Sequence, residues 1–285
     1  MADVTGMLAK RARETGTRLD ILEKDYALSY LLAAMTASPE LGNRLVLKGG
    51  TALRKFYYPD YRFSEDLDFS TRPPGTIPEI ESKMNAAIQG MNERLDERGP
   101  FHAQVEPLLL REPHPLDQSA FLVRVQFPAH RQALCRLKVE ITIDEPILLP
   151  PATHPLIHDY EETLTVNASI YALEEIVAEK LRALLQSRSR LKSRGWGASR
   201  VCRDYYDLWS ILRRETMIDS IPELVRRKCE IRNLNFNDPS EFLAAPLREI
   251  ARTEWKAQIL PFVPDSPAPE TILSELENLI GWLWN

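Results

Sequence analysis

Two short segments constrain this chain more than any other feature of its sequence. The first, Leu47–Thr51, contains a Gly-Gly corner, and the second, Arg62–Phe69, has the alternating pattern of a strand. Because side chains alternate between the two faces of a strand, Asp66 and Asp68 are predicted to share one face while their apolar neighbours face a core. The sequence therefore brings two carboxylates together shortly after a flexible backbone corner.

The residue types in these segments favour a site for magnesium and phosphate. Carboxylate oxygens are the ligands that Mg²⁺ prefers, and the ion usually keeps positions for water and phosphate oxygens. Gly49 and Gly50 lack a Cβ, so their backbone can approach a phosphate closely, and a helix beginning near Thr51 would favour an anion. Alternatively, the glycines form an ordinary turn and the carboxylates a solvated face or part of a calcium loop. A P-loop is excluded, because no Gly-Lys-Ser/Thr follows the glycines.

A third acidic residue is expected on a neighbouring strand. Residues 137–144 alternate cleanly between apolar and polar, which puts Glu140 on the polar face. A carboxylate there would help to hold a metal ion or to deprotonate an attacking hydroxyl. Asp144 is the substitute candidate, and an exposed charge on an edge strand is the alternative interpretation of Glu140.

One lysine lies where the sequence predicts a buried helix face. Along residues 173–185 the apolar positions follow helical spacing, and Lys180 falls in the middle of their stripe. Burying an ammonium is costly without a partner, so Lys180 either snorkels to the surface or meets a polar group. Asp204, at the margin of the next helical stripe, could accept from Lys180, contact a nucleotide or take a proton. The structural alternative for Asp204 is a charge favoured by the helix dipole.

Basic residues accumulate between Lys180 and Asp204, a stretch without an acidic residue in a chain of net charge −5. Such local asymmetry favours a phosphate-rich partner at that place. Trp196, between two glycines, could stack on an unpaired base, as aromatic side chains do in RNA recognition. An ordinary solvated loop is the alternative. The basic residues are Arg182, Arg188, Arg190, Lys192, Arg194, Arg200 and Arg203.

At 285 residues the chain is long enough to bury a full core and is predicted to form two domains, or one domain with a substantial helical extension. Prolines between residues 146 and 155 mark the expected boundary. Residues 1–155 would hold N-terminal helices and a core of strands and helices, and residues 156–285 would be mostly helical. Helices are expected at 20–35 and 78–96, and strands at 45–47, 63–69, 121–127 and 137–143.

The sequence indicates a cytoplasmic protein without a membrane segment. No stretch approaches the ~20 apolar residues of a membrane helix, and the first residues lack the apolar stretch of a signal peptide. Cys135, Cys202 and Cys229 are widely spaced, so neither a disulfide framework nor a zinc site is indicated. A reducing compartment agrees with this cysteine usage.

Several motifs follow one another between residues 23 and 208. They are Glu23-Lys24-Asp25-Tyr26, Lys48-Gly49-Gly50-Thr51-Ala52-Leu53, Arg62-x-Ser64-x-Asp66-x-Asp68, Glu179-Lys180-Leu181-Arg182-Ala183 and Arg203-Asp204-x-x-Asp207-Leu208. The set resembles the AbiEii/AbiGii toxin family, a branch of the nucleotidyltransferase superfamily related to DNA polymerase β. The third carboxylate of that family is often Asp, whereas this chain has the longer Glu140.

The resemblance implies an α+β fold: a polymerase-β-like nucleotidyltransferase core with a mixed sheet, joined to a mostly helical C-terminal region. It implies an enzyme that transfers a nucleoside monophosphate from an NTP to an RNA 3′ end, with tRNA the favoured acceptor, and that blocks translation. The implied cofactor is Mg²⁺, and the implied partners are the NTP, RNA and a cognate antitoxin.

The resemblance also assigns roles to residues. Asp66, Asp68, Lys180 and Asp204 would be catalytic, with Asp204 marked more firmly than Asp207, and Asp66, Asp68 and Glu140 would hold the metal. Gly49, Gly50, Thr51, Arg62 and Lys180 would bind the triphosphate. Two alternatives stay open: an enzyme that AMPylates a protein, and a non-catalytic regulator that binds nucleotide or RNA.

Overall fold

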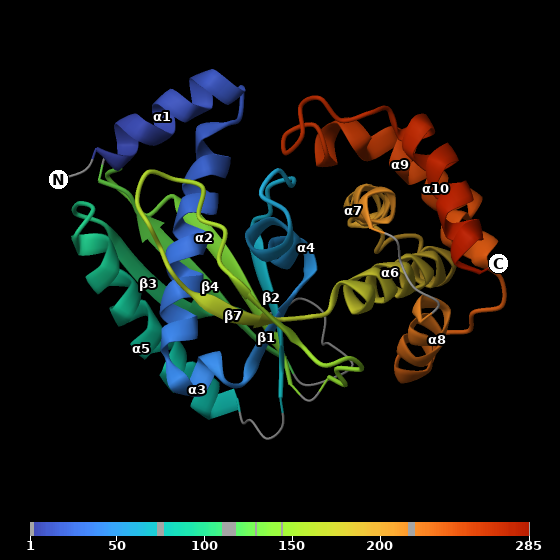
Figure 1. Cartoon of the computed structure of the whole chain (residues 1–285), viewed down its shortest axis with the longest axis horizontal. Helices are drawn as coiled ribbons and strands as arrows, with labels where there is room; N and C mark the ends of the chain where they lie inside the picture. Colours follow the sequence, from blue (N-terminus) through green and yellow to red (C-terminus); the bar gives the residue numbers. More distant parts are fainter. Residues whose placement is uncertain are drawn as a thin grey trace. The chain divides into compact units, whose positions relative to one another are not determined.

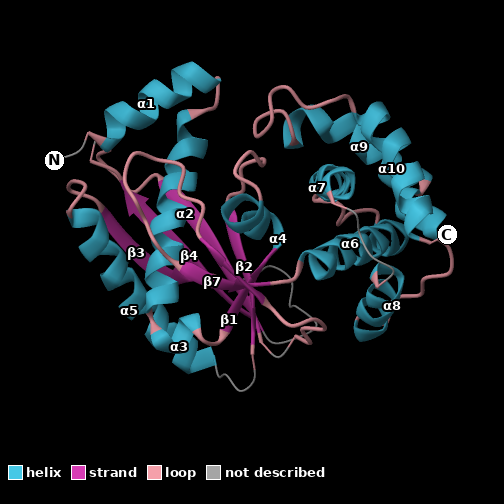
Figure 2. Ribbon diagram, viewed as in Figure 1, coloured by secondary structure: helices cyan, strands magenta, loops and turns pink. Residues whose placement is uncertain are grey.

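The computed structural model describes residues 3–72, 77–109, 118–128, 130–143, 145–215 and 220–284. The chain divides into two compact units, Met1–Tyr171 and Ala172–Asn285. The first unit combines helices with a sheet, and the elements of the second are helices (Figures 1 and 2). This mixture confirms the α+β fold class and the mostly helical character of the C-terminal region.

The first unit contains a seven-stranded mixed sheet with strand order β3-β4-β5-β2-β1-β7-β6. β2 pairs antiparallel with β1 and parallel with β5, so β2 lies at the centre of the sheet. The central strand is therefore the one that carries Asp66 and Asp68. The bounds are β1 Leu45–Lys48, β2 Asp66–Thr71, β3 His102–Pro107, β4 Gln118–Gln126, β5 Cys135–Thr142, β6 Ala152–Pro155 and β7 Asn167–Ile170.

Apolar alternation explains why the central strands pair in this register. Leu67 and Val139 are partners across the parallel β2–β5 ladder, and both side chains are fully buried. A shift by one residue would turn these side chains to the polar face, so the buried face fixes the register. The same register leaves Asp66, Asp68 and Glu140 together on the opposite face.

Helices α2 and α5 pack against the sheet of the first unit. α2 contacts β5 and α5, and α5 contacts β3 and β4. Both helices were predicted, at 20–35 and 78–96, and they extend over Leu19–Ala37 and Ile77–Asp96. The other helical elements of this unit are α1 Val4–Thr15, α3 Pro39–Gly42, α4 Gly49–Ala52 and the π-helix η1 Leu53–Tyr57.

The strand predicted at 63–69 begins only at Asp66, so Ser64 precedes the strand and does not belong to its polar face. Strands β6 and β7 were not predicted as such, because they are short and one of them contains proline. β7 pairs in parallel with β1, and residues 156–171 therefore belong to the first compact unit. The proline-rich region that suggested a boundary at residue 155 leads into the edge strand β6, where proline is tolerated.

The second unit is a set of packed helices. α6 packs against α7 and α8, and α7 packs against α9 and α10. In the described part of the chain no helix is long and apolar enough to cross a membrane. The bounds are α6 Leu173–Arg194, α7 Val201–Arg214, α8 Ile221–Ile231, the 3₁₀ helix η2 Pro239–Leu243, α9 Ala245–Gln258 and α10 Pro269–Leu283.

Candidate functional site

The Gly-Gly corner at the end of β1 packs directly against the segment that carries the predicted carboxylates. Gly49 has φ +80°, and a Cβ at this position would lie 3.2 Å from Asp68 Oδ2. A Cβ on Gly50 would lie 2.7 Å from an Arg62 terminal nitrogen and 3.2 Å from Ser64 Oγ. Glycine is therefore required twice, for the left-handed backbone and for the close approach of neighbouring polar groups.

Thr51 fastens this corner to β2. Its side chain is buried, and its hydroxyl donates a hydrogen bond to the backbone carbonyl of Asp66. Binding of the triphosphate by Thr51 stays a prediction; in the structure the Thr51 hydroxyl holds the corner against the strand. The helix that was predicted to begin near Thr51 is present, but it begins earlier, at Gly49, and continues as the π-helix η1.

The predicted acidic residues share one face of the sheet. Asp68 is the register partner of Glu140 on β5 and of Lys48 on β1. The Glu140 carboxylate is contacted at 2.9 Å by Lys138 Nζ and accepts a hydrogen bond from Gln118 Nε2 at 3.4 Å. The structure therefore puts Glu140 beside Asp68, but a lysine of its own strand already compensates its charge.

The chemistry of these residues suits a magnesium ion held by Asp66 and Asp68. Both side chains are partly exposed, lie two residues apart on one strand, and supply only oxygen ligands. Among the described residues, no group of three His, Cys, Asp or Glu side chains lies close enough to hold a metal ion. Asp144, the substitute third ligand, lies outside the described residues.

A buried network on the same face was missed from the sequence. Lys48 forms an ion pair with Glu145, and Glu145 Oε2 also accepts from Ser70 Oγ at 2.9 Å. The Tyr171 hydroxyl in turn donates to Ser70 Oγ at 2.9 Å. Glu145 follows the end of β5 without any periodic pattern, so only the three-dimensional structure reveals that it stands beside Lys48.

A second network anchors the helix that follows the glycine corner. Asp25 of α2 is buried and contacts Lys55 Nζ at 2.7 Å, while the Tyr160 hydroxyl donates to it at 2.8 Å. Burial alone would raise the pKa of Asp25, but Lys55 and Arg54 outweigh it and lower that pKa. The motif around Asp25, noted only by resemblance, thus ties α2 to η1.

In the second unit, Lys180 is buried in a charged cluster. Its Nζ lies 3.2 Å from Asp204 Oδ1 and 2.5 Å from Asp207 Oδ2. Of the two outcomes considered for Lys180, the structure shows a buried ammonium with partners. Asp204 accepts from Lys180, as one prediction proposed, and Asp207 is an additional partner that the sequence interpretation ranked lower.

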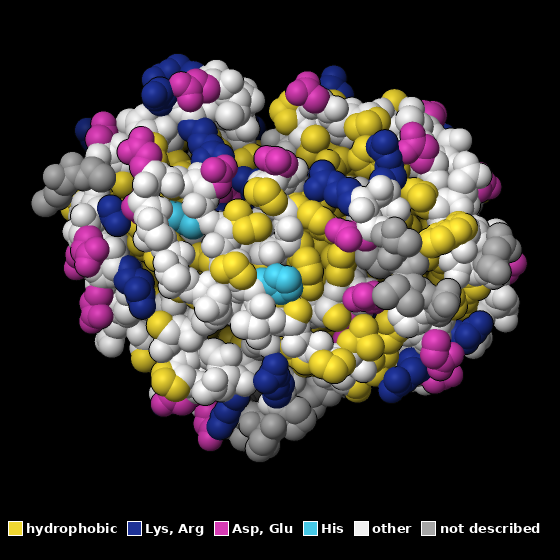
Figure 3. All heavy atoms as spheres, viewed as in Figure 1, with side chains coloured by type: hydrophobic (Ala, Val, Ile, Leu, Met, Phe, Trp, Pro, Cys, Tyr) yellow, Lys and Arg dark blue, Asp and Glu magenta, His cyan; other side chains and the backbone are white. Residues whose placement is uncertain are grey.

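Some of the basic side chains on α6 and the following loop already form ion pairs with acidic side chains. Arg182 pairs with Glu179 at 2.6 Å, and Arg188 pairs with Glu241, which lies far away in the sequence. On the face shown in Figure 3, basic and acidic side chains are interspersed and neither sign forms a continuous field. Trp196 is 56 % exposed, and the Arg194 guanidinium lies 5.6 Å from its ring centre.

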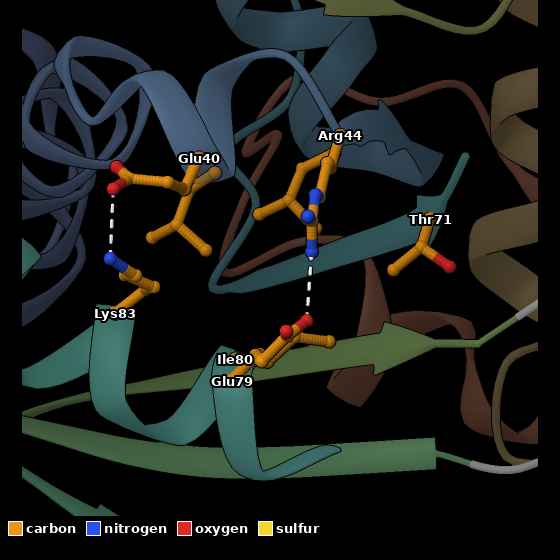
Figure 4. Close-up of a pocket in the computed structure, with 8 residues that line it drawn as sticks. Glu40, Arg44, Thr71, Glu79, Ile80 and Lys83 are labelled. Carbon is orange, nitrogen blue, oxygen red and sulfur yellow. Dashed lines mark hydrogen bonds and ion pairs between the residues drawn. The ribbon is translucent and has the colours of Figure 1, made fainter. Parts of the chain in front are cut away.

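A cavity of about 240 Å³ opens at the other end of the β1–β2 ladder. Figure 4 shows it between α3 and the first turns of α5, with an ion pair of 3.0 Å between Arg44 and Glu79. Leu45 and Thr71, which line it, pair three residues away from the Lys48–Asp68 pair. None of the predicted site residues lines this cavity, so we assign it no part in the site.

Comparison with known families agrees with this arrangement. A family model for the nucleotidyl transferase AbiEii toxin of type IV toxin–antitoxin systems matches residues 30–278. The match includes the glycine corner, the carboxylates of β2 and the cluster around Lys180. A comparison with curated protein sequences finds no match. The chain therefore belongs to the AbiEii family of nucleotidyltransferase toxins.

Proposed function

We propose that this protein transfers a nucleoside monophosphate from an NTP to the 3′ end of an RNA, with tRNA the favoured acceptor, and so blocks translation. The observation that carries the proposal is the packing of Gly49 and Gly50 against Asp68 and Arg62. A backbone corner that approaches a carboxylate and a guanidinium this closely supplies groups for both the metal and the phosphates of an NTP. Family membership supports the same reaction class.

The carboxylates of the first unit would hold the metal. Asp66 and Asp68 would bind Mg²⁺, with Glu140 joining once its contact with Lys138 is exchanged. A bound Mg²⁺ would neutralise charge that develops on the phosphates. Because β2 is the central strand, paired on both sides, it holds the two Asp backbones at fixed positions for this task.

Other side chains would bind the triphosphate and handle the proton. Gly49, Gly50 and Thr51 would offer backbone amides, and Arg62 and Lys180 would offer positive charge. During transfer, an acceptor hydroxyl oxygen bonds to the α-phosphorus while the bond to pyrophosphate breaks, and pyrophosphate leaves with the electron pair. The hydroxyl proton would pass to a carboxylate, for which Asp204 is the candidate.

An RNA acceptor is supported by the exposed Trp196 and the basic residues around it. An exposed indole offers a stacking surface to an unpaired base, and a base of any identity can use it. Basic side chains in this stretch would follow a phosphate backbone without reading its sequence. This combination favours the single-stranded 3′ end of an RNA over a protein side chain.

The test is to incubate the protein with total tRNA, Mg²⁺ and each α-labelled NTP in turn, and to measure label on RNA. We expect label with one or two NTPs, and a loss of roughly 10³-fold in Asp66→Ala, because the variant lacks a ligand for the Mg²⁺ that would neutralise developing charge. Asp96→Ala, which removes an exposed carboxylate at the end of α5, is the matched control and should retain wild-type transfer.

Each alternative result has a defined meaning. Label on a protein band in place of RNA would favour an AMPylating enzyme, and label nowhere would favour a non-catalytic regulator. Label on RNA that persists in Asp66→Ala would contradict the assignment of this carboxylate.

A further inference from the structure

A lysine of the first unit lies opposite one of the carboxylates that would hold the metal ion. Lys48 on β1 and Asp68 on β2 are Cα partners in the antiparallel ladder. Side chains of directly opposite residues lie on the same face of a sheet with their Cβ atoms about 4.5–5.5 Å apart, and opposite charges at such positions attract each other. Asp68 is therefore the partner that the register of β1 and β2 offers to the Lys48 ammonium.

The structure pairs this ammonium with a different carboxylate. Lys48 Nζ forms an ion pair with Glu145, whose side chain is 3 % exposed, and lies 5.8 Å from the centre of the Tyr171 ring. Glu145 Oε2 also accepts a hydrogen bond from Ser70 Oγ at 2.9 Å. Ser70 follows Asp68 by two residues on the same face of β2, and such rows of side chains are spaced about 7 Å apart. Glu145 thus draws the ammonium towards the next row.

The groups around Glu145 are buried and bonded to one another. Ser70 and Tyr171 are both fully buried, and the Tyr171 hydroxyl donates to Ser70 Oγ at 2.9 Å. The backbone amide of Tyr171 donates to the carbonyl of Leu47 at 2.9 Å, which ties the end of β7 to the residue before Lys48. These contacts fix the Glu145 carboxylate relative to β1 and β2.

The place of the ammonium matters for the binding of a metal ion. A lysine ammonium donates up to three hydrogen bonds, and a carboxylate oxygen that accepts one of them binds a second cation less well. An ammonium that moved onto Asp68 would therefore compete with Mg²⁺ for the oxygens of that side chain. A pair of Lys48 and Glu145 that only stabilised the fold would leave the affinity for a metal ion unchanged, so the two roles are separable.

We propose that Glu145 is a positioning residue, which holds the Lys48 ammonium away from Asp68 and so prevents it from competing with the metal ion. This inference rests on the proposed function, in which Asp66 and Asp68 hold Mg²⁺. In this role Glu145 touches neither the metal ion nor the NTP and acts only through Lys48. Loss of Glu145 therefore weakens metal binding while Lys48 is present, and loss of both residues does not.

A double-mutant cycle that measures the Kd for Mn²⁺ alone, without NTP or RNA, tests this role. Glu145→Gln should raise the Kd about tenfold, because the ammonium then bonds to Asp68. Glu145→Gln/Lys48→Met should bring the Kd back to within about threefold of the wild-type value. Glu93→Gln, which removes an exposed carboxylate of α5, is the matched control and should leave the Kd unchanged. Binding that is lost in Asp66→Ala identifies the ions held at this site.

Two results of the cycle would overturn the inference. A Kd that is unchanged in Glu145→Gln would show that Lys48 does not compete for the site. A Kd that is raised in Glu145→Gln and equally raised in the double variant would show that Glu145 acts directly, as a ligand or as part of the fold. Urea unfolding of each variant, measured alongside, shows that the compared proteins are folded.

The Mg²⁺ dependence of NMP transfer gives a second readout. Glu145→Gln should need about tenfold more Mg²⁺ for half-maximal transfer, while kcat at saturating Mg²⁺ stays within about threefold of wild type. The reason is that excess metal ion displaces a competing ammonium. A loss of kcat that excess Mg²⁺ does not recover would contradict a role through Lys48.

Ser70→Ala covers the case in which Glu145→Gln does not fold. It removes a hydrogen bond that orients Glu145, so it should raise the Kd for Mn²⁺ about threefold, and adding Lys48→Met should remove the increase. In that case an unchanged Kd in Ser70→Ala would refute the inference.

Failure of the proposed function gives a different result. Wild-type protein that binds Mn²⁺ but transfers no NMP would refute the proposed reaction, and the cycle of Kd values would still decide the role of Glu145. Wild-type protein that binds no Mn²⁺ would refute both.

Discussion

At the scale of single residues, the site depends on two positions that carry no side chain. Gly49 and Gly50 have no Cβ, and the side chains of Asp68, Arg62 and Ser64 lie where an added Cβ would meet them. Each glycine therefore has a specific neighbour that an added methyl group would meet. These contacts make the corner more demanding than a turn that only needs backbone freedom.

Gly49→Ala should lower transfer activity sharply and reduce stability. Its φ of +80° would cost an alanine about 1–2 kcal/mol, and the new Cβ would press on Asp68 Oδ2 at 3.2 Å. We expect a loss of at least about tenfold in kcat, measured by NMP transfer alongside urea unfolding. Gly90→Ala is the matched control, because it lies in α5 with open space around its Cβ. Wild-type turnover by Gly49→Ala would show that the corner is not catalytically sensitive.

At the scale of elements, α2 and η1 are joined by buried charges. Asp25 and Lys55 are each about 2 % exposed or less, and burial lowers the pKa of Lys55 despite its partner. Removing one charge would leave the other without compensation in the core. The helix after the glycine corner thus depends on a carboxylate in another helix.

Asp25→Asn should destabilise the protein by about 3–5 kcal/mol, because it leaves the Lys55 ammonium buried without its counter-ion. The double variant Asp25→Asn/Lys55→Met should recover part of this loss. Denaturant unfolding measures the stability of the single and the double variant. Lys83→Met, which breaks an exposed ion pair with Glu40, is the control and should change stability by less than about 1 kcal/mol. A single variant as stable as wild type would mean that this pair contributes little.

Sequence patterns predicted the elements with strong periodicity and missed those set by tertiary contacts. The helix around Tyr26 and the strand around Val139 repeat apolar residues at the expected spacing, so they were predictable. β7 has only four residues and exists because Ile170 pairs with Leu47. The roles of Glu145 and Asp207 depend on partners distant in sequence, which periodicity does not reveal.

At the scale of the whole molecule, stability should depend on pH through Glu162. Burial would raise the pKa of this carboxyl, but hydrogen bonds from His158, Tyr26 and Tyr30 outweigh burial and lower the pKa to about 2. Because the folded pKa lies below the ordinary value of 4.5, the contribution of Glu162 is present above about pH 4.5. It is lost as the pH falls towards 2.

Glu162→Gln should therefore be less stable than wild type at pH 7, and the difference should shrink as the pH falls below 4.5. The difference in unfolding free energy between the two proteins, measured by denaturant at several pH values, checks this. A difference that stays constant with pH would show that Glu162 contributes by packing and not by its charge.

The proline content of β6 has a consequence for how this molecule meets other chains. β6 is an edge strand, and an edge normally exposes backbone groups that can recruit a strand from a neighbouring chain. Pro155 within the strand and Pro150 and Pro151 just before it have no amide hydrogen to offer. The sheet therefore resists extension at this edge, which protects the folded protein against aggregation by strand addition.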